Sequence, residues 1–290
     1  MTGLVERRWR SAEGLWLHAR DYAASGGEAR LPVICIHGLT RNARDFEDVA
    51  PWIAAQGRRV LAVDIRGRGR SDHDPDPMNY KPVTYARDML ALMDSLGIAR
   101  AVFVGTSMGG LITLMLAALR LPAVAAAILN DVGPEVAQQG LDRIAGYAGK
   151  PVDIRDWDDA VAYLKRTMGP AFPDMADARW RALARRSFVE NADGVPRLDY
   201  DPGIARPFAD RRPPRRSIIA WLLFRRLARR RPTLLLRGEL SDLLSAEIAV
   251  RMRRAAPAMH YAEVPRVGHA PLLEEPAARA AIETFLAKLP

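Results

Sequence analysis

The sequence predicts an α/β protein whose core is a mostly parallel, doubly wound sheet. Short apolar runs of the kind that form strands buried on both faces alternate with helical segments along much of the chain. One such run, residues 101–105, stops at Gly105 and is followed by Ser107, Gly109 and apolar residues at helix spacing. Strand, tight turn and helix, repeated in that order, are typical of this fold class.

Most elements of the predicted sheet follow from these apolar runs. Residues 15–22 alternate weakly between apolar and polar side chains, which predicts an exposed, antiparallel edge strand that residues 5–10 could pair with. Buried strands are predicted at residues 32–36, 59–64, 101–105, 125–129 and 233–236, and a last strand at residues 260–264. Helices are predicted at residues 46–55, 83–96 and 108–119, and a final helix at residues 277–288.

The alternation of strands and helices breaks after Asp131. Residues 134–216 contain no comparable apolar strand, but helices are predicted at residues 153–168 and 177–188 and a turn at 191–194. We therefore expect a core of residues 1–133 and 217–290 with an inserted, mainly helical cap at residues 134–216. Its aromatic residues should mostly form a small core of their own, with one or two lining a pocket: Tyr147, Trp157, Tyr163, Phe172, Trp180, Phe188, Tyr200 and Phe208.

Composition narrows the functional classes. The 290-residue chain has a net charge of +9, and its 43 basic residues are nearly all arginines, which fits an Arg-rich codon bias better than an anionic partner. No nucleic-acid-binding module and no membrane-length apolar run is present, and residues 1–8 lack a signal-peptide pattern, so a cytoplasmic protein without membrane insertion is expected. Residues 218–224, seven apolar residues followed by arginines, favour a core helix over an interfacial or dimer face.

Cysteine usage excludes further classes. Cys35 is the single cysteine, so the chain forms no intrachain disulfide and no cysteine metal cluster, and its place in an apolar strand predicts a buried, inert thiol. No metal site is expected.

The spacing Gly-x-Ser-x-Gly around Ser107 predicts an exposed nucleophile. A serine at the tip of a tight strand-to-helix turn takes a strained backbone conformation, and the residues two before and two after it approach each other. A Cβ atom at either position would clash, so both Gly105 and Gly109 are required. The N–H groups of the following helical turn then point towards the group that the serine attacks.

A serine nucleophile needs a base, and only two of the five histidines follow predicted strands directly enough to reach it. His269 lies between the last strand and the final helix, which predicts the base; His37 is expected to brace its loop. Asp242, in the turn after residues 233–236, is the favoured acid partner because the order Ser107, Asp242, His269 suits this fold. Asp131, which ends the preceding strand, is the competitor; its other role would be to bind backbone N–H groups near the cap.

A tetrahedral intermediate needs two N–H donors for its oxyanion. One is expected from Met108, directly after the nucleophile, and the other from Leu39, in the loop that follows residues 32–36. Gly38 allows that loop to come close to the serine.

Together these pieces resemble the α/β-hydrolase superfamily, specifically its capped ester, lactone and carbon–carbon bond hydrolases. The matching segments are His37-Gly38, residues 64–71, residues 105–110, Gly238 with Asp242, and Gly268-His269. The resemblance implies a serine hydrolase without a cofactor, which forms an acyl-enzyme with a small or medium carboxylic ester or lactone. It also implies that Asp64 belongs to a structural turn and is not catalytic.

Alternative functions stay open, among them cofactor-free perhydrolase or lyase chemistry at the same site. A meta-cleavage-product hydrolase would break a carbon–carbon bond with the same triad, and Arg41 is then a possible contact for the carboxylate of its anionic dienoate substrate. A ligand-binding protein could keep the same fold without catalysis. The partner predicted in every case is a small molecule, and the sequence gives no indication of the oligomeric state.

Overall fold

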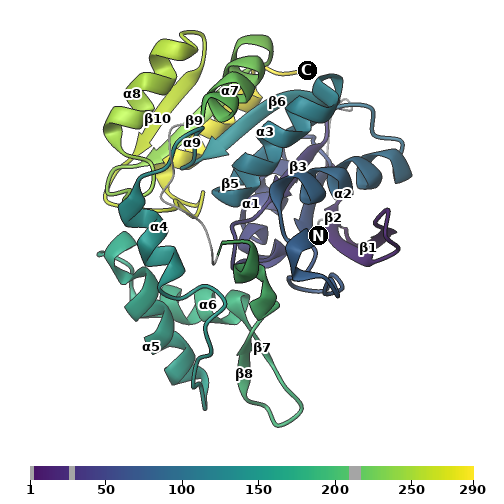
Figure 1. Ribbon diagram of the computed structural model, residues 1–290. Helices are drawn as coiled ribbons and strands as arrows, with labels where there is room; N and C mark the ends of the chain where they lie inside the picture. Colours follow the sequence, from purple (N-terminus) through teal and green to yellow (C-terminus); the bar gives the residue numbers. More distant parts are fainter. Residues whose placement is uncertain (1–2, 26–29, 209–216) are drawn as a thin grey trace.

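The computed structural model describes residues 3–25, 30–208 and 217–290, and these residues form an eight-stranded sheet of order β1-β2-β4-β3-β5-β6-β9-β10 (Figure 1). The pairs from β4 through β10 are parallel, whereas β1 and β2 are antiparallel to their neighbours. The strands are β1 (Leu4–Arg10), β2 (Trp16–Tyr22), β3 (Val33–Ile36), β4 (Val60–Asp64), β5 (Ala101–Thr106), β6 (Val124–Asn130), β9 (Thr233–Gly238) and β10 (His260–Val264). The predicted mostly parallel, doubly wound sheet is confirmed.

Helices cover both faces of the sheet and create a hydrophobic core on each. One face carries α2 (Pro82–Ser95), α3 (Met108–Arg120), α7 (Ile218–Arg230) and α8 (Ala246–Ala255). The other face carries α1 (Val49–Ala54) and α9 (Pro276–Leu286). Because side chains of a strand alternate between faces, Phe103 packs into the first core and Val104 into the second. The continuous apolar runs of β3 to β6 follow from this double burial.

Two predicted elements differ from the structure. Residues 16–22 do not form the sheet edge, because β2 pairs with β1 on one side and with β4 on the other, which makes β1 the edge strand. The helix predicted at residues 46–55 is divided into a 3₁₀ helix, η1 (Ala43–Phe46), and α1. Pro51 explains this break: it falls in the first turn of α1, where its missing N–H is not needed, whereas it would interrupt a longer helix.

The chain between β6 and α7 forms a separate layer, seen below the sheet in Figure 1. It contains α4 (Gln138–Ala145), α5 (Trp157–Met168), α6 (Asp177–Ser187) and a hairpin of β7 (Phe188–Glu190) and β8 (Pro196–Leu198). The sequence did not indicate α4 or the hairpin strands. A third hydrophobic cluster holds this layer together and includes Tyr163, Phe172, Trp180 and Phe188. The predicted end of the insertion at residue 216, like Met1 and Thr2, lies outside the described residues.

Short 3₁₀ helices complete the described chain: η2 (Pro77–Asn79), η3 (Leu121–Ala123), η4 (Gly169–Ala171) and η5 (Pro202–Phe208).

Helix α7 packs Phe224 and Leu227 into the core, but Ile218, Ile219 and Leu222 at its start are exposed, so the predicted core helix buries only one face. Of the helices described, none has the length and apolar character needed to span a membrane.

The order of the strands reverses between β3 and β5. Chain order runs from β3 to β4 on one side, and from β5 to β6 on the other. Loops that leave the carboxyl ends of two such strands separate and leave a crevice, which is the usual place for a ligand in an open parallel sheet. The loop with His37 and Gly38 follows β3, and Ser107 follows β5.

Candidate active site

Ser107 lies between β5 and α3 in a strained backbone conformation, with φ 51° and ψ −114°. A Cβ atom on Gly105 would lie 2.4 Å from the carbonyl carbon of Gly109, and one on Gly109 would lie 2.1 Å from the carbonyl oxygen of Ile36. Both glycines are therefore required by close backbone contact, as the motif predicts. The turn presents the Ser107 side chain at the carboxyl edge of the sheet.

His269 connects Ser107 to a buried carboxylate. Its Nε2 atom lies 2.8 Å from the hydroxyl of Ser107, and its Nδ1 atom lies 2.8 Å from Oδ2 of Asp131. Asp131 is fully buried, and its carboxylate also accepts hydrogen bonds from the N–H of Gly238 (2.9 Å) and the hydroxyl of Ser241 (2.6 Å). These bonds fix the carboxylate, which in turn fixes the imidazole ring.

The structure corrects the predicted acid partner. Asp242 follows β9, but its carboxylate binds Arg143 of α4 at 2.5 and 2.8 Å, and the carboxylate on His269 is that of Asp131. Burial opposes the charge of Asp242, but the hydrogen bonds and charge of Arg143, together with the charge of His269, lower the pKa of Asp242. The distance of each aspartate from its strand could have favoured Asp131 from the sequence. Asp131 directly follows a buried strand, whereas Asp242 lies four residues beyond Gly238.

His37 braces the loop after β3, as predicted. Its Nδ1 atom donates to the carbonyl of Gly38 (2.7 Å), and its Nε2 atom accepts from the N–H of Ile65 (3.1 Å). Burial lowers the pKa of His37 to about 4, so the ring is neutral near pH 7. A neutral ring with both nitrogens engaged holds the loop in place and has no free site for proton transfer.

Asp64 is also structural. Its buried carboxylate accepts hydrogen bonds from the N–H groups of Ala43 (2.7 Å) and Arg70 (3.1 Å) and lies 2.7 Å from Nδ1 of His18. It therefore joins β4 to η1 and to the turn at residues 64–71.

Leu39 and Met108 lie on the two sides of the nucleophile. A Cβ atom on Gly38 would lie 3.8 Å from Cβ of Ser107, so the loop with Leu39 is close to it. Within the described chain, neither the N–H of Leu39 nor that of Met108 donates to a protein acceptor. Both groups are thus available to a ligand oxygen.

Arg68, which the sequence did not single out, contacts both of these residues. Its guanidinium donates to the carbonyl of Leu39 (3.0 Å) and lies 3.8 Å from Sδ of Met108. The side chain is fully buried between the rings of Tyr80 and Tyr85, 5.4 and 5.1 Å from their centroids. Among residues 3–25, 30–208 and 217–290, it has no carboxylate partner.

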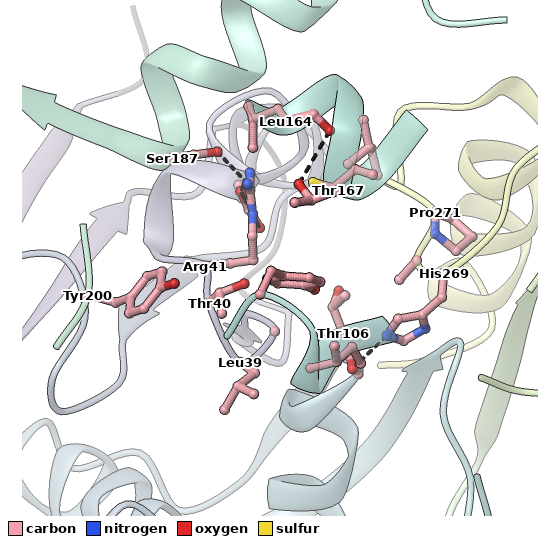
Figure 2. A pocket seen from close by; sticks show the side chains of 18 of the residues that line it. Leu39, Thr40, Arg41, Thr106, Leu164, Thr167, Ser187, Tyr200, His269 and Pro271 are labelled. Atoms are coloured by element: carbon pink, nitrogen blue, oxygen red, sulfur yellow. Dashed lines mark hydrogen bonds and ion pairs between the residues drawn. The ribbon is translucent and has the colours of Figure 1, made fainter. Parts of the chain in front are cut away.

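A cavity of about 90 Å³ adjoins Ser107 and His269, bounded by core loops on one side and by α4, α5 and β8 on the other (Figure 2). Arg41 points into it but is already paired with both carboxylate oxygens of Asp45, and it also donates to the hydroxyl of Ser187. Tyr163 and Tyr200 line the same cavity. No cluster of three metal-ligating side chains occurs in the described segments.

A doubly wound parallel sheet with a serine at a strained strand-to-helix turn defines the α/β-hydrolase class. The chain belongs to the alpha/beta hydrolase family, because the model of that family matches residues 33–282.

Several relatives of known name are hydrolases. The chain is 38% identical to a 3-hydroxybutyrate-oligomer hydrolase of Cupriavidus necator over 266 residues, which is 90% of each protein. It is 44% identical to an α/β hydrolase of Novosphingobium aromaticivorans of known structure, with a TM-score of 0.91 and coverage of 100% of both chains. A mouse sn-1-specific diacylglycerol lipase is 36% identical over 116 residues, which is 39% of this chain and 37% of the lipase. These similarities identify the protein as a hydrolase.

Proposed function

We propose that this protein is a serine hydrolase that cleaves carboxylic esters with a triad of Ser107, His269 and Asp131. The observation that carries the proposal is the continuous chain of hydrogen bonds from the serine hydroxyl through the imidazole to a fully buried carboxylate. Asp131 replaces Asp242 in the role predicted from the sequence.

The geometry suits acyl transfer. His269 accepts the proton of Ser107 through Nε2, while Asp131 accepts the Nδ1–H bond and stabilises the imidazolium that forms. The serine oxygen attacks the ester carbonyl, and the N–H groups of Leu39 and Met108 hold the oxyanion. His269 then protonates the departing alcohol. A water molecule, deprotonated by His269, hydrolyses the acyl-enzyme and releases the acid.

The layer between β6 and α7 acts in this proposal as the cap expected at residues 134–216. Its residues supply one wall of the cavity, and the core supplies the other. Substrate size and polarity would then be selected mainly by the inserted layer, while the chemistry belongs to the core.

Among esters, we propose short oligoesters of hydroxy acids as the substrate to test first. The named relative acts on 3-hydroxybutyrate oligomers and aligns with 90% of this chain. A dienoate substrate of a carbon–carbon bond hydrolase is less well supported, because its carboxylate would need a free cation and Arg41 is neutralised by Asp45. The cytoplasmic location stays a prediction from the sequence.

The test is a comparison of three variants with the wild type. Ser107→Ala should abolish both hydrolysis of p-nitrophenyl butyrate and labelling by a fluorophosphonate. Asp131→Asn should lower kcat by roughly 10³- to 10⁴-fold, because the amide would donate to Nδ1 and impose the wrong tautomer on the ring. Asp242→Asn should keep kcat within about 10-fold of the wild type, because its carboxylate binds Arg143 and not the histidine.

Each variant also needs a thermal unfolding curve, so that loss of activity is not confused with loss of the fold. Hydrolysis that persists in a pure preparation of Ser107→Ala would rule out the proposed mechanism. A larger loss in Asp242→Asn than in Asp131→Asn would return the acid role to Asp242.

A further inference from the structure

Two buried tyrosine side chains line the cavity. Tyr163, from α5, and Tyr200, which precedes η5, both line the cavity and are only 5% and 6% exposed. The two hydroxyls lie close to each other, and that of Tyr200 lies close to the backbone of Gly149, but within the described residues neither oxygen has a hydrogen-bond partner in normal geometry. A buried hydroxyl without a partner loses its bonds to water and gains nothing in return, so native proteins rarely keep one without a reason.

Both rings are held firmly. Tyr163 packs edge-to-face on Phe188, with centroids 6.0 Å apart and an angle of 88° between the rings. The backbone of Tyr200 pairs with that of Arg68, and its neighbours Asp199 and Asp201 bond to the turn at residues 67–69. Tyr200 therefore belongs to the inserted layer but is fixed to the core beside the proposed oxyanion site.

The hydroxyls are neutral donors. Burial is the main cause that raises the pKa of Tyr163 and of Tyr200, so each phenol keeps its proton at neutral pH. Figure 2 shows the Tyr200 hydroxyl directed towards the middle of the cavity, on the opposite side from His269. A ligand that reaches from Ser107 across the cavity would meet it.

The charges that border the cavity select an uncharged acceptor. Arg41 and Asp45 line it as a closed ion pair, which adds no net charge. A carboxylate placed there would be desolvated beside Asp45, and Arg41, the arginine that lines the cavity, is already paired. A carbonyl oxygen needs only donors, and the two phenols are donors.

We propose that the hydroxyls of Tyr163 and Tyr200 form a subsite for a second, uncharged ester carbonyl of the chain that Ser107 attacks. This inference rests on the proposed function and makes it more specific. The substrate class is an oligoester with at least two ester groups, bound with its internal unit in the cavity and its carboxylate end outside. A simple alkyl ester fills the same cavity but leaves both hydroxyls unpaired.

The experiment compares three substrates: the linear 3-hydroxybutyrate trimer, its methyl ester, and p-nitrophenyl butyrate. Tyr163→Phe and Tyr200→Phe should each lower kcat/KM for both trimers by about 10-fold, because each removes one hydrogen bond to the substrate. The value for p-nitrophenyl butyrate should stay within about 2-fold, because that ester has no second carbonyl to lose. Tyr22→Phe, a buried tyrosine on β2 away from the cavity, is the matched control and should change none of the three.

Equal losses on all three substrates, or no loss on any, would overturn the subsite. Loss with the free trimer but not with its methyl ester would also overturn it, because the recognised group would then be the carboxylate.

A binding measurement tests the subsite independently of the proposed hydrolase activity. Calorimetry of the trimer methyl ester with Ser107→Ala, and with Ser107→Ala combined with Tyr200→Phe, requires no turnover. Weaker binding by about 10-fold in the double variant supports the subsite even if hydrolysis is absent. Equal binding, or no binding to either variant, refutes it, while labelling of Ser107 still reports on the hydrolase itself.

Discussion

At the scale of the residue, Arg68 is a buried charge that we expect to support the proposed reaction without touching the substrate. Its guanidinium contacts Leu39 and Met108, the two residues whose N–H groups are proposed to hold the oxyanion. Within the described part of the chain no carboxylate pairs with it, so its charge is not cancelled locally. Inside a protein, such a charge stabilises a developing anion more strongly than it would in water.

Arg68→Met should therefore lower kcat for p-nitrophenyl butyrate by roughly 10- to 100-fold, with KM changed by less than about 3-fold. Arg68→Lys should recover part of the loss, because it restores charge but not the hydrogen bond that Nε donates to Leu39. The measurement is steady-state kinetics together with the affinity for a boronate inhibitor that mimics the tetrahedral anion. A structural role alone would lower the melting temperature and leave the inhibitor affinity of the folded fraction unchanged.

At the residue level, the sequence is most informative where local geometry decides the arrangement. The glycines around Ser107 are required by backbone contacts. His269 follows the last strand, β10, and lies against the hydroxyl of Ser107. The carboxylate that contacts His269 could not be chosen from the sequence, because Asp131 and Asp242 both follow strands. The difference between them depends on the left-handed conformation of Asp131, with φ 56°, and on Arg143, which arrives from the insertion.

At the scale of the element, Arg186 of α6 makes several ion pairs with the core. Arg186 binds Glu274 (2.7 Å) and Glu47 (3.0 Å) and also contacts Asp48, all three of which lie near the start of core helices. The guanidinium is mostly buried, with 11% of its side chain exposed, so these pairs are screened less than surface pairs.

Arg186→Met should loosen this attachment. We expect the free energy of unfolding to fall by about 1–3 kcal/mol, because Glu274 and its neighbours lose charged hydrogen bonds while the apolar stem is kept. The control is Arg155→Met: Arg155 precedes α5, its side chain is 77% exposed, and it forms an ion pair with Asp159 of that helix, so a much smaller change is expected. Urea unfolding measures both, and limited proteolysis should cut the inserted layer faster in Arg186→Met. Equal effects of the two substitutions would show that the ion pairs of Arg186 do not stabilise the attachment of α6 to the core.

Sequence reading of the elements was most accurate for buried strands and their helices. The continuous apolar runs place β3 to β6, β9 and β10 within a residue or two of their observed ends. The inserted layer was less readable, because α4 has only one buried residue, Gly140, and the hairpin strands have three residues each. Their positions depend on contacts with the core that a local pattern does not contain.

At the scale of the whole molecule, buried ionisable groups predict how stability depends on pH. Burial opposes the charge of Asp21, Asp48 and Asp242, but their arginine partners outweigh it and lower each pKa. A carboxyl whose pKa is lower in the folded state stabilises the fold above its unfolded pKa of about 3.9. That stability is lost as the pH falls through the folded pKa values.

Two other groups act in the opposite sense. Burial, helped by the charges of Glu13 and Asp74, raises the pKa of Asp88 to about 6, so the folded state holds this proton more tightly than the unfolded chain does. The fold therefore gains stability from Asp88 as the pH falls from about 6 to about 4. His18 is buried, which opposes its charge, but Asp64 and Glu6 raise its pKa. Its contribution is complete below about pH 6.5 and is lost as the pH rises through the folded pKa.

These signs together predict a maximum of stability between about pH 4.5 and 6, with a decline on both sides. Melting temperatures measured from pH 3 to pH 8 at constant ionic strength test it directly. Asp88→Asn should flatten the rise between pH 6 and 4.5, because its amide does not titrate, and leave the loss below pH 4 unchanged. A wild-type melting temperature that falls steadily from pH 7 to pH 4.5 would contradict this prediction. It would show that the carboxylates around Arg66 remain charged in the fold and that the pKa of Asp88 is not raised.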